Sequence, residues 1–435
     1  MKMTVSLCTR VEGHGNIKFF LQKDEISNVN FEVQAIRGFE NILSNKKLID
    51  VPRIVSRVCG LCYGSQSIAS CKAIEDLFEI EPSNQSILLR RLLMIGELIN
   101  SHSTHFFFQA FPDLFVILKG QVNPLPLEDL IRFDPQLTSI MIDLIRIGKE
   151  LVNIFGGRSA HPITPTIGGM AYPPSKKNIG NARKYLQKAV DDVKWVLERF
   201  QELFSQVQPP DSFSIANSTF FGLHNNEKYD RYDGTLRLMQ NTSTLADFPV
   251  KNYTQYIDRD RTLPGIHAYL KEDHKLLVGP IARYEIIKNY RINEIDPYLD
   301  FINKSWKKNL VLSNYLYLVE ILRAAFDGLA ILEDTKLTNP IEIPPLNSIK
   351  KAEGIGVVEA PRGTLIHHYI VNNSRMSLDK VKLFVATEIN IPTINDILTR
   401  ECKILYEKVH DLEEVKKTAQ MIVRSFDPCI SCATH

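Results

Sequence analysis

Cys59-Gly-Leu-Cys62 and Cys429-Ile-Ser-Cys432 are two CxxC pairs that stand near opposite ends of a chain of 435 residues. Each pair offers two soft thiolates from a single turn, and together they supply the donor set of a metal centre. The two pairs of a zinc ribbon usually lie about 12–20 residues apart, whereas these are 367 positions apart (429 − 62). Only a folded domain of full size can unite them, so a shared metal would join both ends of the chain in its interior.

A site built from both ends predicts one intertwined domain over residues 1–435, although the length alone allows two or three domains. Hydrophobic residues make up 44% of the chain and charged residues 23%, as in globular proteins. The 52 basic and 50 acidic residues nearly balance, which gives no reason to expect a nucleic acid or an anionic membrane as partner. No apolar run approaches the roughly 20 residues that span a bilayer, so we expect no membrane insertion.

The seven cysteines are too sparse, and odd in number, for a disulfide framework. This usage predicts a reducing, cytoplasmic location with four cysteines reserved for metal. The other three, Cys8, Cys71 and Cys402, are expected to be small buried hydrophobic residues.

Sequence periodicity predicts a mostly helical α+β fold with small sheets near the two ends of the chain. Alternating apolar residues predict strands at 15–22, 27–36, 355–372 and 380–387. Helical spacing begins at about residue 65, and Ser83 is the expected N-cap of a long helix toward residue 108. Further helices are expected at 125–155, 175–207, 304–333 and 412–425, while residues 210–300 show no clear pattern.

Spacing alone leaves two interpretations of the four cysteines open, a structural zinc site and a catalytic metal centre. The flanking residues favour a metal in either case. Pro428 fixes the backbone direction before Cys429, and Arg57 before the first pair can offset the negative charge of the thiolates.

Five segments, in order along the chain, resemble the motifs of the nickel–iron hydrogenase large subunit. The two cysteine motifs are Arg57-Val-Cys-Gly-Leu-Cys62 and Asp427-Pro-Cys-Ile-Ser-Cys-Ala-Thr-His435. The other three are Thr9-Arg-Val-Glu-Gly-His-Gly15, Arg37-Gly-Phe-Glu40 and Glu359-Ala-Pro-Arg-Gly-Thr-Leu-Ile-His-His-Tyr369. They are most similar to the cytoplasmic, methanogen-type branch, which includes viologen-reducing and deazaflavin-reducing enzymes.

The resemblance implies a nickel–iron centre held by the four thiolates. By position, Cys59 and Cys429 would be terminal nickel ligands, and Cys62 and Cys432 would bridge nickel and iron. The iron would carry one carbon monoxide and two cyanide ligands, with Pro361 packed beside them.

The resemblance also implies roles for charged residues near the metals. Arg362 would place its guanidinium over the open side of the centre, where an always-charged donor can polarise dihydrogen or steer a proton. Asp427 would balance that charge. Glu12 would accept the proton that heterolytic splitting releases; the alternative is a carboxylate that only pairs with Arg10.

Glu40 and His435 match the ligands of a second metal ion near the C-terminus, magnesium or iron, in the family. A carboxylate suits a hard cation such as magnesium. Histidine is a less usual ligand for such an ion, so this part of the prediction depends on the resemblance.

One position departs from the family pattern, in which CxxC continues to a histidine. Here Gln66 stands at that place; its amide can donate a hydrogen bond to a bridging sulfur but cannot titrate. We therefore expect a working site with altered redox or oxygen behaviour.

Several histidines match family segments but have ordinary structural explanations. His102 and His105 share one face of the long helix, and the family places this pair beside the active site. Core packing or hydrogen bonding is the alternative for both, and equally for the neighbours His367 and His368.

The leading functional hypothesis is reversible oxidation of dihydrogen to protons and electrons. The three remaining cysteines are scattered, so electrons would leave through a partner, an iron–sulfur small subunit. Further partners would be a heterodisulfide reductase or a flavin subunit. The competing hypotheses are a zinc or thiolate scaffold without catalysis and a relative of the quinone-binding subunit of respiratory complex I, which lacks the metal cysteines.

Overall fold

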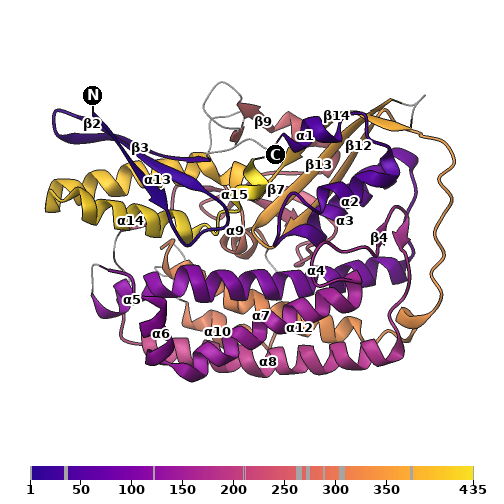
Figure 1. The fold of residues 1–435 in the computed structure, drawn as a ribbon, viewed down its shortest axis with the longest axis horizontal. Coiled ribbons are helices and arrows are strands. Elements are labelled where there is room, and N and C mark those ends of the chain that lie inside the picture. Colours follow the sequence, from indigo (N-terminus) through magenta and orange to yellow (C-terminus); the bar gives the residue numbers. More distant parts are fainter. Residues whose placement is uncertain are drawn as a thin grey trace.

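The computed structural model describes residues 2–33, 38–120, 123–208, 210, 212–260, 267–270, 275–287, 290–302, 309–372 and 376–434. Figure 1 shows a layer of long helices below, small sheets above, and the N-terminal strands lying beside the C-terminal helices. Both CxxC pairs lie where these parts meet. No helix in the described ranges is long and apolar enough to cross a membrane.

The N-terminal sheet consists of β1 (Lys2–Cys8), β2 (Gly15–Gln22) and β3 (Glu25–Val33), paired antiparallel in that order. The predicted hairpin of the second and third strands is confirmed up to Val33, and residues 34–36 lie outside the described part. The first strand was not predicted. Backbone amides of β3 donate to side chains of helix α13 (Ala386–Val409): Phe31 to Asn395 at 2.8 Å and Val29 to Thr399 at 3.0 Å. The two ends of the chain are thus joined directly.

The helical layer is built around α4 (Asn84–Thr104), α7 (Pro135–Gly156), α8 (Lys176–Phe204) and α12 (Tyr315–Ile331). The predicted cap is confirmed, because the Ser83 side chain accepts a hydrogen bond from the Ser86 amide. The chain then continues through a π-helical turn, His105–Ala110, into α5 (Phe111–Lys119). The first residue of that turn, His105, lies 3.4 Å from Asp427 of the second cysteine motif, and π-helical turns are frequent at functional sites.

Two predicted helices have different bounds in the structure. The segment 125–155 is divided into α6 (Leu127–Phe133) and α7, because Asp134 caps α7 and Pro135 lacks the amide that would continue α6. The helix expected at 304–333 begins only at Tyr315, after a short 3₁₀ turn; residues 303–308 lie outside the described part. The helix expected at 175–207 is confirmed as α8.

Residues 210–300, which showed no clear pattern, contain a four-stranded sheet in the order β11-β6-β7-β8. Its strands are β6 (Thr219–His224), β7 (Thr235–Gln240), β8 (Ser243–Phe248) and β11 (Leu276–Leu277). The short pairs are β4 (Pro165–Thr166) with β5 (Gly169–Met170), and β9 (Ile257–Asp260) with β10 (His267–Leu270). The remaining short helices are α1 (Phe39–Leu43), α2 (Val51–Val55), α9 (Pro280–Ile286) and α10 (Asp296–Phe301).

The predicted strand at 355–372 is in fact a hairpin of β12 (Glu353–Ala360) and β13 (Gly363–Asn372), joined at Pro361-Arg362. Gly363 has a φ of +137°, a value that L side chains rarely adopt and that this tight turn needs. The third strand, β14 (Ser377–Phe384), ends before the predicted limit of 387.

Helix α13 was missed by the sequence analysis, because it is rich in β-branched residues and contains Pro392. Its buried contacts with β3 and the sheets outweigh these local preferences. The helix expected at 412–425 is confirmed as α14 (Leu412–Ser425). The second cysteine pair lies at the start of α15 (Ile430–Ala433), with Cys429 as its N-cap residue and Cys432 inside it.

Helix α3 (Tyr63–Phe78) follows the first cysteine pair and packs closely on β12. A Cβ atom added at Gly356 would lie 2.0 Å from the carbonyl oxygen of Ala69 and 2.5 Å from the amide of Ala73. Both obstacles are backbone atoms, so only glycine allows this approach of helix and strand.

We expect Gly356→Ala to destabilise the protein by about 1–3 kcal/mol, because the backbone of α3 would have to move. Gly180→Ala is the matched control: this glycine lies inside α8 with open space around its Cα, and alanine there favours the helix by about 1 kcal/mol. Urea unfolding of the two variants should give shifts of opposite sign, and equal stability of Gly356→Ala and the unaltered chain would contradict the packing argument.

Candidate metal centre

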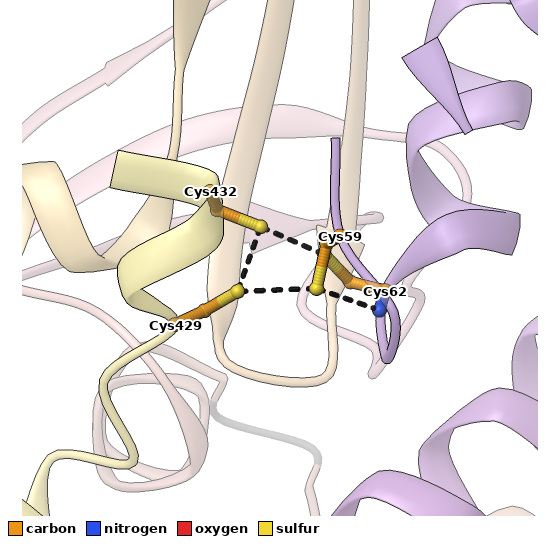
Figure 2. A group of neighbouring side chains, drawn as sticks. All are labelled: Cys59, Cys62, Cys429 and Cys432. Atoms are coloured by element: carbon orange, nitrogen blue, oxygen red, sulfur yellow. Dashed lines mark hydrogen bonds between the residues drawn. The ribbon is translucent and has the colours of Figure 1, made fainter. Parts of the chain in front are cut away.

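Four cysteine sulfurs from the two ends of the chain converge on one point (Figure 2). The Sγ–Sγ distances are 3.1 Å for Cys59 and Cys429, 3.0 Å for Cys62 and Cys432, and 2.8 Å within the second pair. All four cysteines are buried free thiols, and their four sulfurs all lie within 4.8 Å of one another. The predicted convergence of the two CxxC pairs is therefore present in the fold.

The backbone around each pair fixes the direction of the sulfurs. In the first pair, the amides of Leu61 and Cys62 both point at the Cys59 sulfur, at 3.2 and 3.3 Å. In the second pair, the amide of Cys429 donates to the Thr387 hydroxyl at 2.7 Å. Thr387 stands in the first turn of α13, so the missed helix positions a cysteine of the site.

The four buried thiols of this cluster do not ionise equally. Burial opposes ionisation of Cys59, but hydrogen bonds from the other three thiols hold its pKa well below the usual value. Burial raises the pKa of Cys429 well above the usual value. Several thiolates can coexist at these separations only if a positive charge lies among them, so the donor set fits soft or borderline metal ions.

A cavity of about 20 Å³ adjoins Cys62, Cys429 and Cys432. Besides cysteines, its wall consists of Gln66, Ala360, Arg362, Leu365, Val385, Ala386 and Thr387. The wall is mostly apolar, with one guanidinium, one amide and one hydroxyl. Such a space suits small ligands that have polar ends.

Arg362 lies at the turn between β12 and β13, beside the cysteines. Its Nη2 atom is 3.0 Å from Oδ1 of Asp427, and its Nε donates to the Asp427 carbonyl at 3.0 Å. Both side chains are buried. The expected proximity of the two residues is thus present, and Asp427 joins the arginine loop to the second cysteine motif.

Arg283 of α9, which the sequence analysis missed, holds the backbone of this turn. Its guanidinium donates to the carbonyls of Ala360 and Pro361, at 3.2 and 2.9 Å. The same guanidinium pairs with two buried carboxylates, Glu320 at 2.6 Å and Glu359 at 2.9 Å. Glu320 is a charged residue within the apolar helix α12, and this mismatch was the available sequence signal.

The two histidines of α4 and the π-helical turn lie behind the arginine loop. His102 Nε2 is 2.8 Å from Oε2 of Glu320. His105 Nε2 is 2.8 Å from the Asn314 side-chain oxygen, and its Nδ1 is 3.4 Å from Oδ1 of Asp427. Both rings are therefore part of the buried polar network around Arg362.

Glu12 contacts the second cysteine pair through its backbone and side chain. Its carbonyl accepts from the Ile430 amide at 3.1 Å, and its carboxylate accepts from the Ser431 amide at 2.9 Å and from the Ser431 hydroxyl. Arg10 does not depend on this carboxylate, because its guanidinium pairs with Asp113 at 2.5 Å. The alternative in which Glu12 only holds Arg10 is therefore wrong.

Gln66 takes part in a chain of buried hydrogen bonds that ends at the sulfurs. Its Nε2 atom is 4.0 Å from the Cys62 sulfur and 3.8 Å from the Cys432 sulfur. His367 Nε2 is 2.7 Å from the other end of the amide, Oε1, and His367 Nδ1 is 2.7 Å from the Tyr369 hydroxyl. Thiolates only accept hydrogen bonds, so the amide nitrogen must face the sulfurs, and His367 donates to the amide oxygen.

Glu97 of α4 is a second buried carboxylate that the sequence analysis missed. It accepts hydrogen bonds from the amides of Gly64 and Ser65, at 2.5 and 3.0 Å, and so caps α3 immediately after Cys62. Burial raises the pKa of Glu97 to about 7, despite these donors.

The second predicted metal site has a different environment from the one expected. Glu40 accepts a hydrogen bond from the Leu383 amide at 2.8 Å and forms an ion pair with Arg259 at 2.7 Å. His435 lies outside the described residues. The expected magnesium or iron ligand Glu40 is therefore already bound to a cationic side chain.

Comparison with known proteins gives a consistent result. Residues 37–116 and 250–435 match the model of the family described as nickel-dependent hydrogenase. The chain is 28% identical to a subunit of the F420-non-reducing hydrogenase vhc of Methanococcus voltae, over all of this chain and 95% of that protein. It is 25% identical to the NAD-reducing hydrogenase HoxS subunit beta of Cupriavidus necator, over all of this chain and 94% of that protein.

Solved structures agree in fold. A crystal structure of an NAD⁺-reducing [NiFe]-hydrogenase in the H₂-reduced state superposes with a TM-score of 0.90, at 25% identity and complete coverage of both chains. The Ni-Fe-Se hydrogenase of Desulfovibrio vulgaris Hildenborough gives a TM-score of 0.78, again over both complete chains; at 20% identity this likeness concerns the fold alone. The predicted fold class is thereby confirmed.

The buried network behind Arg362 predicts loss of stability in acid. Burial lowers the pKa of His102 to about 4 from a usual 6.5. Burial acts to raise the pKa of Glu320, but the charge of Arg283 lowers it to about 2. In both cases the unfolded chain binds the proton first, so stability falls with decreasing pH, below 6.5 for His102 and below 4.5 for Glu320.

For His102 the shift corresponds to about 3 kcal/mol lost between pH 6.5 and 4. Urea midpoints measured across this range should fall less steeply for His102→Gln, which has no titrating group at that position. Identical slopes for the variant and the unaltered chain would show that His102 is not held neutral by its surroundings.

Proposed function

Because the chain belongs to the nickel-dependent hydrogenase family, we propose that Cys59, Cys62, Cys429 and Cys432 hold the nickel–iron centre at which this catalytic subunit oxidises dihydrogen reversibly. The observation that carries this proposal is the convergence of four buried sulfurs from the two ends of the chain within 4.8 Å. Soft thiolates are the donors that nickel and low-spin iron accept.

Within this set, Cys59 and Cys429 are proposed as terminal nickel ligands, and Cys62 and Cys432 as the bridge to iron. The cavity beside the cysteines is lined by Cys62, Cys429 and Cys432, so it adjoins three of the four proposed ligands. Its wall combines apolar groups from Leu365, Val385 and Ala386 with polar groups from Arg362 and Thr387, the mixed contacts that one carbon monoxide and two cyanides on the iron would need. Pro361, which lies between Ala360 and Arg362 in the sequence, is proposed as a neighbour of those ligands.

The competing hypotheses account for less of the structure. A zinc scaffold needs four sulfurs but gives no role to the cavity or to the buried Arg362. A relative of the complex I subunit lacks the metal cysteines, whereas all four are present here. The family match and the hydrogenase relatives favour the enzyme.

When bound, the nickel–iron centre supplies the site at which dihydrogen is split and its electrons are taken up. Arg362 presents a permanent positive charge beside the sulfurs, and Asp427 holds that guanidinium in place at 3.0 Å. In a buried site a fixed charge acts more strongly than in water. In this arrangement Arg362 would polarise the substrate, and Asp427 would orient the guanidinium and balance its charge.

Glu12 is the proposed acceptor of the released proton. Its backbone pairs with Cys429, and its carboxylate lies on Ser431, between the cysteines of the second pair. From there a proton can pass toward the partly exposed residues of the Thr9–Gly13 segment. A general base so placed contributes about 10²–10⁴-fold to the rate.

Electrons must leave through another protein. We infer an iron–sulfur small subunit as the immediate partner, because the relatives are subunits of hydrogenases with several chains. A heterodisulfide reductase or a flavin subunit is the proposed next acceptor, in the cytoplasm. The contacts that join β3 to α13 support one intertwined unit over residues 1–435.

An infrared spectrum of the purified complex tests the centre directly. We expect one carbonyl band and two cyanide bands that shift when dihydrogen is admitted, with nickel and iron found by elemental analysis. A blank spectrum from a matured complex that contains zinc would establish the scaffold hypothesis and remove ours.

Replacing Glu12 by glutamine should lower dihydrogen oxidation by about 10²–10⁴-fold, because the amide cannot take up the proton. The infrared bands should persist, which separates proton transfer from assembly. Glu32→Gln is the control, since this carboxylate of β3 pairs with Lys18 at 2.5 Å rather than with a residue of the second cysteine motif. Activity of Glu12→Gln close to that of the control would assign the proton transfer to another group.

Gln66→Leu should move the carbonyl band to lower wavenumber and make the reduction potential of the centre more negative. The reason is that a hydrogen bond to a thiolate withdraws electron density from the metal. His367→Phe should produce a smaller shift of the same sign and add nothing to Gln66→Leu, since it acts through the amide. Replacement of the adjacent His368, which forms hydrogen bonds with Tyr253 and Glu353 instead, is the control. An unchanged infrared spectrum of Gln66→Leu would contradict the hydrogen bond from the Gln66 amide to the sulfurs.

A further inference from the structure

Two carboxylates and one backbone carbonyl converge beside β9, at the upper edge of the molecule in Figure 1, where α1 and β14 also lie. Glu40 comes from α1, Glu388 from the first turn of α13, and the carbonyl from Leu383 near the end of β14. The Glu388 side chain is fully buried, and that of Glu40 is 13% exposed. Two negative groups so far from water require a cation between them.

The guanidinium of Arg259 occupies that position. Its Nη1 lies 2.7 Å from Oε1 of Glu40, its Nε lies 2.6 Å from Oε1 of Glu388, and its Nη2 donates to the Leu383 carbonyl. A second bond runs from Nη2 to the other oxygen of Glu388, at 3.2 Å. The fork of Arg259 therefore binds Glu388 through both carboxylate oxygens, the strongest geometry for this pair.

The surroundings of Arg259 stabilise its charge further. Its guanidinium carbon lies 4.4 Å from the centre of the Phe384 ring, a cation–π contact, and its side chain is only 5% exposed. The carboxylates of Glu388 and Glu40 raise the pKa of Arg259 above the usual value, against the effect of burial. The cation is thus matched to its site in shape, charge and packing.

A magnesium ion does not fit these residues as they are arranged. It needs six oxygens in octahedral geometry at about 2.0–2.1 Å and retains several waters. Here Oε1 of Glu40, both carboxylate oxygens of Glu388 and the Leu383 carbonyl already accept from the guanidinium. A second cation at the same point would also be repelled by Arg259.

We propose that the guanidinium of Arg259 serves as the cation beside Glu40, in place of the second metal ion that the family resemblance predicts there. The proposal rests on the proposed function only in that the expected second metal comes from the hydrogenase family. It assigns to Arg259 a positioning role, since the residue touches neither substrate nor the cysteine sulfurs.

The role of Arg259 reaches the metal centre through α13. Glu388, which Arg259 holds, directly follows Thr387, whose hydroxyl accepts the hydrogen bond of the Cys429 amide at 2.7 Å. Holding Glu388 therefore fixes the helical turn that orients a cysteine of the second pair. A protein side chain performs this task without any metal having to be loaded.

Elemental analysis of the chelator-dialysed complex, combined with thermal unfolding, tests the proposal. We expect nickel and iron but no stoichiometric magnesium, calcium, manganese or zinc, and no anomalous iron peak beside Glu40 in crystals. Thermal unfolding of the unaltered complex should be the same in EDTA and in millimolar magnesium chloride. Arg259→Ala should unfold at a lower temperature and recover part of the loss in magnesium chloride, because the two carboxylates would have lost the guanidinium between them.

Two further variants complete the test. Arg291→Ala is the control, because the half-exposed Arg291 pairs with Asp300, which is exposed, and Asp296, which is half-buried, and should show neither effect. Arg259→Lys keeps the positive charge but loses the forked geometry of the guanidinium, so it should be destabilised without any response to magnesium. This variant replaces Arg259→Ala in the test if Arg259→Ala does not fold.

A divalent ion retained beside Glu40 in the unaltered complex would overturn the proposal. So would equal stability and equal magnesium response of Arg259→Ala and the unaltered protein. Absence of nickel would instead overturn the proposed function, so the same metal analysis distinguishes the two failures.

Discussion

The structure depends on one constraint: four thiolates from opposite ends of the chain must meet in a space closed to water. The first pair comes from the loop before α3, and the second from the turn into α15. To bring them together, β3 donates hydrogen bonds to α13, Glu12 pairs with the second cysteine motif, and α3 packs through Gly356 onto β12. The long helices below provide the rigid base on which these contacts rest, so neither end of the chain can place its cysteines alone.

Buried guanidinium groups recur around this centre as fixed counter-ions. Arg362 pairs with Asp427 beside the sulfurs, Arg283 binds Glu320 and Glu359 behind them, and Arg259 joins Glu40 to Glu388. Each also donates to a backbone carbonyl, so each holds a turn as well as a charge. Buried pairs of this kind contribute little net stability, but breaking one partner leaves an uncompensated charge. Their value here is geometric: they keep the arginine loop and the first turn of α13 in position.

The elements that sequence analysis identified were those with strong local signals. The capped helix after Ser83, helices α8 and α14 and the hairpin of β2 and β3 all carry clear periodicity. Helix α13 was missed because its β-branched residues and Pro392 oppose a helix locally. The hairpin of β12 and β13 has a turn of only two residues, too short to interrupt the strand pattern, so a single strand was predicted there. Arg283, Glu97 and Arg259 were missed as site residues because nothing in their immediate sequence relates them to the cysteines.

The sequence by itself determined the family, the four thiolates and the proximity of Arg362, Asp427 and Glu12 to them, because these residues belong to compact motifs whose order is preserved along the chain. Only the tertiary structure decided which partners these residues have. It paired Gln66 with His367, 301 positions away, and Glu40 with Arg259, 219 positions away. The physical reason is that a buried donor or charge pairs with whichever complementary group the packing brings within about 3 Å. Such distances between residues far apart in the chain cannot be derived from the sequence.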